Sequence, residues 1–454
     1  MLDAIRWDAN LIRRYNRAGP GYCSYPLQRQ FHEDVSSFEL LHALRESRKA
    51  RRPLSLYVHL PFCNSACFHC DRLRIVTQDR ELAARYLHYL QREIDLISCH
   101  LDRQQQVEQL HLGGGTPTFF NQEELRQLMA HLRQRFTLLD DSSTDYSIDV
   151  DPRSASWSTM GLLRELGFNR VNLGVEDLAP QVQSAVNRQQ SLEQTCNLVE
   201  AARTLQYRSI NIELTYGLPQ QTPESFAHTL QTIMALQPER LSLRHYQHRP
   251  ERFPLQQRIN ALELPGDAGN LAMLENSIEQ LTRAGYRYIG LEQFALNDDE
   301  LAIAQEDGLL QRNVHGYTSH GHCDLIGLGV SAISQVGDLY CQNTCDLEQY
   351  LTQLHNAQLS TCRGHTCSLD DRLRRHIIQR LLCEFELEFS DIEKPFGIDF
   401  RSYFADIWND LQQMANDGLI ELCDRRLDIT ASGRLLVRSV CMLFDRYRKP
   451  LACA

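Results

Sequence analysis

The stretch LSLYVHLPFCNSACFHCDR, residues 54–72, decides the fold of this chain. Its first half is an apolar run, rich in residues that favour strands, and it predicts a buried strand over residues 54–62. Cys63, Cys67 and Cys70 follow directly, with three and then two residues between them. The sequence therefore places three thiols on one loop at the end of one strand.

The same unit of a short apolar strand followed by a helix repeats along the middle of the chain. Further strands are expected at residues 107–115, 145–152, 170–177, 209–219 and 240–246, and helices at 80–98, 122–135, 193–205 and 223–236. Repeated strand–helix units predict an α/β fold with a parallel sheet and outer helices, either as an open sheet or as a barrel.

Chemistry in such folds lies at the carboxyl ends of the strands. The cysteine loop follows the first strand, and the glycine run of residues 113–115 ends the second. Asp149, Glu176 and Glu213 lie on or near the ends of the next three strands. This convergence predicts one site built from several strand ends, although carboxylates buried beside ion pairs are the alternative.

Three thiolates from one loop suit three irons of a [4Fe–4S] cluster and leave the fourth iron open for a small molecule. Zinc is the competing metal, but no fourth cysteine or histidine at the usual paired spacing completes its set. His69 lies inside the loop, and we do not expect it to be a ligand.

The composition is that of a folded protein of two or three domains, with 454 residues, 43% hydrophobic residues and 23% charged residues. We expect a cytoplasmic monomer, since no apolar segment is long enough to cross a bilayer and the N-terminus carries no secretory signal. Clustered cysteines in the cytosol indicate metal rather than disulfides. The net charge of −11 argues against a nucleic-acid partner.

Four segments are expected along the chain. They are an N-terminal extension (residues 1–50), a barrel (51–260), a region that completes the barrel and covers the substrate (261–365), and a mainly helical domain (366–454). The last segment has the order of a winged-helix-like module. We interpret it as a packing or lid domain, and DNA binding is the alternative that the acidic charge disfavours.

The spacing C-x3-C-x2-C after the first strand, with GGGTPT at residues 113–118 after the second, resembles the radical S-adenosylmethionine (SAM) superfamily. The resemblance implies a partial (β/α)6 barrel. It also implies a [4Fe–4S] cluster held by Cys63, Cys67 and Cys70. The open iron would bind the amino and carboxylate groups of SAM, and His69 would stack on adenine. One-electron reduction would then release a 5′-deoxyadenosyl radical.

A closer resemblance runs over nearly the whole chain. Segments such as DANLIRRYNRAGPGYCSYP, PLSLYVHLPFC, LHLGGGTPT, NRVNLGVED, YGLPQQTPESFAHTL and GYTSHGHCDLIGLGVSAIS are similar to the oxygen-independent coproporphyrinogen III oxidases. That family oxidatively decarboxylates two propionates of a tetrapyrrole to vinyl groups, giving protoporphyrinogen IX in haem biosynthesis. The resemblance implies two SAM molecules and an electron donor that the sequence does not identify.

The resemblance also implies individual roles. The SAM on the cluster would contact Tyr57, Gly114, Asp149 and Ile333. A second SAM would contact His69, Gly115, Thr116, Glu176, Arg188, Glu213 and Gln247. The catalytic residues would be Tyr57 and His315.

Several positions depart from the family pattern. Asp71 and Arg72 replace a glycine and a cysteine, and Gly21 replaces an arginine suited to substrate carboxylates. At the second SAM site, His69, Glu176, Glu213 and Gln247 stand for phenylalanine, glutamine, aspartate and alanine. These changes indicate a divergent paralogue. The alternatives are a changed tetrapyrrole substrate or a haem-binding chaperone that keeps cluster and SAM.

Overall fold

A computed structural model describes residues 5–16, 19–141 and 144–448. Its described residues fall into two compact units. The barrel unit comprises residues 33–285 and 322–364, and the C-terminal unit comprises the segments up to His32, 286–321 and from His365 onward. No described helix has the length and apolar character needed to cross a membrane.

Six parallel strands in chain order form the centre of the barrel unit. They are β1 (Leu54–Leu60), β4 (Gln106–Gly114), β6 (Asp145–Val150), β7 (Arg170–Glu176), β8 (Ser209–Tyr216) and β9 (Arg240–His245). Every residue of β1 is buried, as expected for a strand covered on both faces. The strands expected from the sequence are confirmed, with ends that shift by at most three residues.

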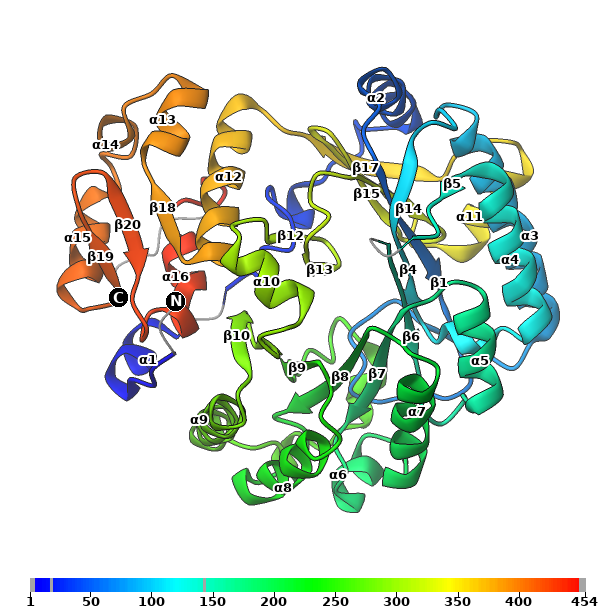
Figure 1. Cartoon of the computed structure of the whole chain (residues 1–454), viewed down its shortest axis with the longest axis horizontal. Helices are drawn as coiled ribbons and strands as arrows, with labels where there is room; N and C mark the ends of the chain where they lie inside the picture. Colours follow the sequence, from blue (N-terminus) through cyan, green and yellow to red (C-terminus); the bar gives the residue numbers. More distant parts are fainter. Residues whose placement is uncertain (1–4, 17–18, 142–143, 449–454) are drawn as a thin grey trace. The chain divides into compact units, whose positions relative to one another are not determined.

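Helices follow these strands along the chain and cover the outside of the sheet, as Figure 1 shows. They are α3 (Arg80–Ser98), α4 (Gln122–Arg135), α5 (Trp157–Glu165), α6 (Pro180–Ala185), α7 (Leu192–Thr204), α8 (Pro223–Met234) and α9 (Asp267–Arg283). Side chains cap several N-termini, for example Asn121 with Glu124 at the start of α4. The expected partial (β/α)6 barrel is confirmed.

The sheet continues beyond β1 with strands that come from much later in the chain. β14 (Asp324–Leu328) pairs in parallel with β1, and Gly327 lies opposite Tyr57. β15 (Ile333–Val336), β16 (Leu339–Asn343) and β17 (Thr361–Thr366) follow in order, and β14, β15 and β16 are antiparallel neighbours. α2 (Ser37–Ala50) and α11 (Leu347–His355) belong to the same unit.

The C-terminal unit combines helices with small antiparallel sheets. Its main elements are α10 (Glu300–Glu306), α12 (Leu369–Glu384), α13 (Ser390–Phe396), α15 (Trp408–Asn416) and α16 (Val437–Cys441), with α1 (Ala9–Tyr15) from the start of the chain. β18 (Glu386–Glu388), β20 (Arg426–Ile429) and β19 (Ile420–Leu422) form one sheet in this order. β12 (Gln311–Asn313) and β13 (Gly316–Thr318) form a hairpin. The mainly helical character expected for residues 366–454 is confirmed.

A buried carboxylate on α3 fixes the turn between β14 and β15. Glu93 is 1% exposed and accepts hydrogen bonds from the Gly329 N–H (2.6 Å), the Asn343 amide (2.6 Å) and the Tyr350 hydroxyl (2.7 Å). Burial raises the pKa of Glu93 to about 7, against the lowering effect of these three donors. Glu93 therefore helps to position Ile333, which follows the same turn.

The ionisation of Glu93 predicts a pH dependence of stability. Because the folded pKa of about 7 lies above the ordinary value of 4.5, the folded chain binds this proton more tightly than the unfolded chain. The resulting stabilisation is fully present below pH 4.5 and is lost as the pH rises through 7, which amounts to about 3 kcal/mol. Urea unfolding at pH 5, 6.5 and 8 measures this slope, and Glu93→Gln is expected to flatten it. An unchanged slope in the variant would refute the assignment.

Candidate active site

The cysteine loop leaves the sheet at the end of β1 and returns beside it. β2 (Phe62–Cys63) pairs in parallel with β3 (Ile75–Val76), which closes the loop at its base. The Phe68 N–H donates to the Val186 carbonyl at 2.9 Å, and the Asn187 amide donates to the Ala66 carbonyl at 2.7 Å. The loop is therefore anchored both at its ends and along its length.

The three thiols on this loop are shielded to different degrees. Cys63 and Cys67 are buried, and Cys70 is half-buried. Burial raises the pKa of the Cys63 thiol. Arg74 and a contact with the Thr116 hydroxyl act in the opposite direction, but burial outweighs them. Burial lowers the pKa of Arg74, but the three cysteines and Glu176 outweigh burial and raise it.

Guanidinium groups also face Cys67. The Arg153 Nη2 lies 3.5 Å from the Cys67 sulfur, and the Arg188 Nη1 lies 3.7 Å from it. Asp151 accepts hydrogen bonds from both arginines, and their charges lower its pKa to about 2 although burial acts in the opposite direction. Cations that surround thiols stabilise the thiolate form, which is the form that binds metal.

The geometry fits a cluster with several irons better than a single ion. Among the described residues, the sulfur atoms of Cys63, Cys67 and Cys70 do not all lie within 4.8 Å of one another. Tetrahedral zinc, with Zn–S bonds of about 2.3 Å, would hold its thiolates about 4 Å apart. The wider arrangement and the surrounding arginines suit an anionic iron–sulfur cluster.

The glycine run at the end of β4 lies directly against the base of the cysteine loop. The Gly115 N–H donates to the Leu60 carbonyl and the Thr116 N–H donates to the Phe62 carbonyl, both at 2.8 Å. A Cβ on Gly115 would lie 2.5 Å from the Phe62 carbonyl oxygen. Gly114 has a φ of +106°, a conformation that favours glycine. Only glycine permits this approach of backbone to backbone.

Tyr57 lies on β1 between neighbouring aromatic and polar groups. Its hydroxyl is 3.0 Å from His59 Nδ1, and its ring stacks on His111 at 5.7 Å between centroids. Burial raises the pKa of Tyr57 and lowers the pKa of His59 to about 4, so both side chains are neutral at neutral pH. Ile333, half-buried at the start of β15, belongs to the strand on the other side of Gly327.

Asp149, at the end of β6, is held as an ionised carboxylate. It accepts a hydrogen bond from the Asn172 amide at 3.0 Å and lies 3.5 Å from His111 Nε2. Burial would raise its pKa, but His111, Arg72 and the Asn172 hydrogen bond outweigh burial and lower it. The carboxylate therefore keeps its charge at neutral pH.

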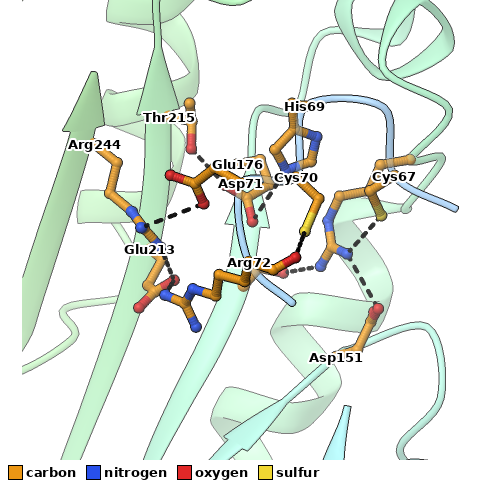
Figure 2. A network of polar contacts seen from close by, with 12 residues as sticks. Cys67, His69, Cys70, Asp71, Arg72, Asp151, Glu176, Glu213, Thr215 and Arg244 are labelled. Atoms are coloured by element: carbon orange, nitrogen blue, oxygen red, sulfur yellow. Dashed lines mark hydrogen bonds and ion pairs between the residues drawn. The ribbon is translucent and has the colours of Figure 1, made fainter. Parts of the chain in front are cut away.

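Glu176 ends β7 in a strained backbone conformation. Its φ is +69°, and the register between β7 and β8 shifts between Gly174 and Glu176. The Thr215 hydroxyl donates to its carboxylate at 2.5 Å, and His69 Nε2 lies 3.8 Å away (Figure 2). Bulges and left-handed residues of this kind are typical of functional sites, because they re-aim a side chain.

The sequence predicts that these residues converge, and the barrel unit brings them together at or near the carboxyl ends of its strands. Asp151 and Arg153 were not predicted as site residues, although the motif VDPR directly follows Asp149. Arg74 and Arg244 were not predicted either. His315 belongs to the C-terminal unit, where it is exposed in the turn between β12 and β13, and its catalytic role stays a prediction.

Comparison with known proteins agrees with this geometry. Residues 57–233 match the radical SAM superfamily, and residues 367–436 match the HemN C-terminal domain. The chain is 63% identical to an oxygen-independent coproporphyrinogen III oxidase of Pseudomonas aeruginosa over 98% of this chain and 97% of that protein. It is 43% identical to the enzyme of that name from Escherichia coli, over 99% and 97% of the two chains.

A solved structure shows the same fold. The structure described as coproporphyrinogen III oxidase (HemN) from Escherichia coli, a radical SAM enzyme, aligns with a TM-score of 0.93 and 42% identity. The alignment covers 98% of this chain and 100% of that one.

Proposed function

This chain belongs to the family of oxygen-independent coproporphyrinogen III oxidases, and from that membership we propose that it decarboxylates coproporphyrinogen III. Two propionates become vinyl groups, and the product is protoporphyrinogen IX. The observation that most strongly supports this proposal is the 63% identity to a named oxidase over 98% of the chain. That span includes both the barrel and the C-terminal region. Each relative reported above is named as an oxidase, so we favour the oxidase over the haem-binding chaperone.

In this proposal Cys63, Cys67 and Cys70 hold a [4Fe–4S] cluster. When bound there, the cluster and SAM would supply one-electron radical chemistry at the β-carbon of a propionate. Loss of one hydrogen atom from that carbon, of CO2 from the carboxylate and of one electron to an acceptor would leave the vinyl group. Arg153 and Arg188, within 3.5 and 3.7 Å of the Cys67 sulfur, balance the negative charge of the thiolates.

Tyr57 and the glycine run shape the place where SAM is expected. The neutral Tyr57 hydroxyl beside His59 offers a hydrogen-bonding group without adding charge. Gly114 and Gly115 leave room for a ligand to approach the backbone. Asp149 offers an ionised acceptor for a cationic or hydroxyl group of the cofactor. His315 is proposed to act on the substrate.

The test is anaerobic reconstitution with iron and sulfide, followed by incubation with coproporphyrinogen III, SAM and a reductant. Mass spectrometry after liquid chromatography is expected to find a product that has lost two CO2, together with matching 5′-deoxyadenosine. Protein without cluster is the control and is expected to form neither. Deoxyadenosine without decarboxylation would refute the substrate. Tight, stoichiometric haem binding without decarboxylation would support the chaperone instead.

A further inference from the structure

An arginine of the cysteine loop lies between two carboxylates to which the family resemblance gives SAM contacts. Arg72 Nη1 is 3.6 Å from Asp149 Oδ2, and Arg72 Nη2 is 3.7 Å from Glu213 Oε2. Asp149 is the next-to-last residue of β6, and Glu213 lies three residues before the end of β8. A single guanidinium, 33% exposed, therefore bridges two strands that are not neighbours in the sheet.

A second arginine extends this arrangement to the other member of the Asp–Arg pair. Arg244 Nη1 lies 3.7 Å from Glu213 Oε2, and Arg244 Nη2 lies 3.9 Å from Asp71 Oδ1. Figure 2 shows Glu213 between the side chains of Arg72 and Arg244. Negative and positive groups alternate from Asp71 to Asp149, so Glu213 already faces two cations.

The other groups expected at a second SAM site are also engaged with protein. Glu176 accepts from Thr215 and faces His69. The Gln247 amide lies 2.9 Å from His245 Nδ1, and its carbonyl accepts from Arg249 at 3.3 Å. Arg188 donates to the Gly174 carbonyl at 2.6 Å and to Asp151 at 3.1 Å. Glu176 and Gln247 thus each accept a hydrogen bond from the protein, and Glu213 faces two guanidiniums.

We propose that Arg72 takes the place of a second SAM molecule, so that this protein binds a single SAM, the one on the cluster. The inference rests on the proposed function, because it assumes the cluster and the first SAM. SAM carries its positive charge on a sulfonium and an ammonium group. A carboxylate that faces two guanidiniums attracts such a ligand weakly, and the guanidiniums repel it.

The two SAM positions respond differently to Arg72. By the family resemblance, the first SAM is chelated by the open iron, and side chains only add to that attachment. A second SAM has no metal to hold it and depends on side chains such as Glu213 and Gln247. Arg72 weakens the attraction of both Asp149 and Glu213 for a cation, but only the second position depends on side chains alone.

The experiment is equilibrium dialysis of the reconstituted protein against labelled SAM without reductant, with iron content measured in parallel. Wild-type protein is expected to bind one SAM per cluster. Arg72→Ala removes the guanidinium and is expected to bind two. Arg72→Lys keeps one cation near both carboxylates and is expected to bind one.

Arg85→Ala is the matched control for the loss of an arginine. Arg85 pairs with Glu348 at 2.6 Å, with the two side chains 49% and 72% exposed, so its loss leaves the site intact. This variant is expected to bind one SAM per cluster. Wild-type protein that binds two SAM molecules would overturn the inference, and so would an Arg72→Ala variant that binds one.

The outcomes separate this inference from the proposed function. A wild-type protein that decarboxylates coproporphyrinogen III while it binds two SAM molecules would refute only the single-SAM inference. Cluster-containing protein that binds no SAM in any variant would refute both. Decarboxylation with one bound SAM, together with a second SAM in Arg72→Ala, is the expected result.

Discussion

Replacing Cys63 by alanine is expected to abolish both SAM cleavage and decarboxylation, while the chain stays folded. The loop supplies three thiols for three irons. The radical chemistry of the reaction comes from the bound cofactors rather than from side chains. The loss of one ligand therefore removes the cofactor. The barrel core should survive, because its strands are packed through apolar side chains such as Leu56 and Leu110 that do not depend on a cluster.

Iron content, the visible absorbance of the reconstituted protein and circular dichroism measure these effects together. Cys196→Ala is the control, since Cys196 lies on α7, outside the loop, and is expected to leave iron content and activity unchanged. A Cys63→Ala protein that loses its secondary structure would contradict the expected independence of core and loop. One that keeps full iron content would contradict the ligand role.

Gly115→Ala is expected to lower the free energy of unfolding by about 1–3 kcal/mol, the usual cost of forcing a group into packed surroundings. The added Cβ would lie 2.5 Å from the Phe62 carbonyl oxygen and 2.5 Å from the Pro61 carbonyl carbon. Backbone atoms cannot rotate away as a side chain can. The chain before Cys63 must therefore move, and we also expect weaker retention of the cluster.

Gly161→Ala is the matched control for this substitution. Gly161 lies within α5, and a Cβ there meets no atom within 4 Å. Because alanine is the better helix former, this variant is expected to gain up to about 1 kcal/mol. Urea unfolding of the two variants beside wild-type protein measures the contrast. Equal stability of the two variants would refute the steric argument.

The sequence predicted the first six parallel strands well because their signals are local. Each is a short apolar run followed by turn residues and then by an amphipathic helix, so neighbouring residues carry the information. The carboxyl-end rule then predicted that Asp149, Glu176 and Glu213 would converge with the cysteine loop, and they do. Chain order and sheet order coincide in this part of the fold, which makes local reasoning sufficient.

Other features depend on contacts between distant residues, and no local pattern specifies them. β14 has five residues and pairs with β1, from which more than half of the chain separates it. The approach of Arg72 to Asp149 and Glu213 requires knowledge of where a loop residue points. The left-handed conformation of Glu176 is equally hidden, since a glutamate in sequence gives no sign of positive φ.

The late position of β14 has a consequence for how the protein is made on the ribosome. Cys63 emerges early, but β14, one of the two strands that lie beside Tyr57, is complete only at Leu328, about 265 residues later. At about 5–20 residues per second, translation takes about 15–50 s to cover that distance. The nascent chain therefore carries its thiols for that period without the neighbouring strand. Iron–sulfur loading into a complete pocket must wait until β14 has emerged and docked.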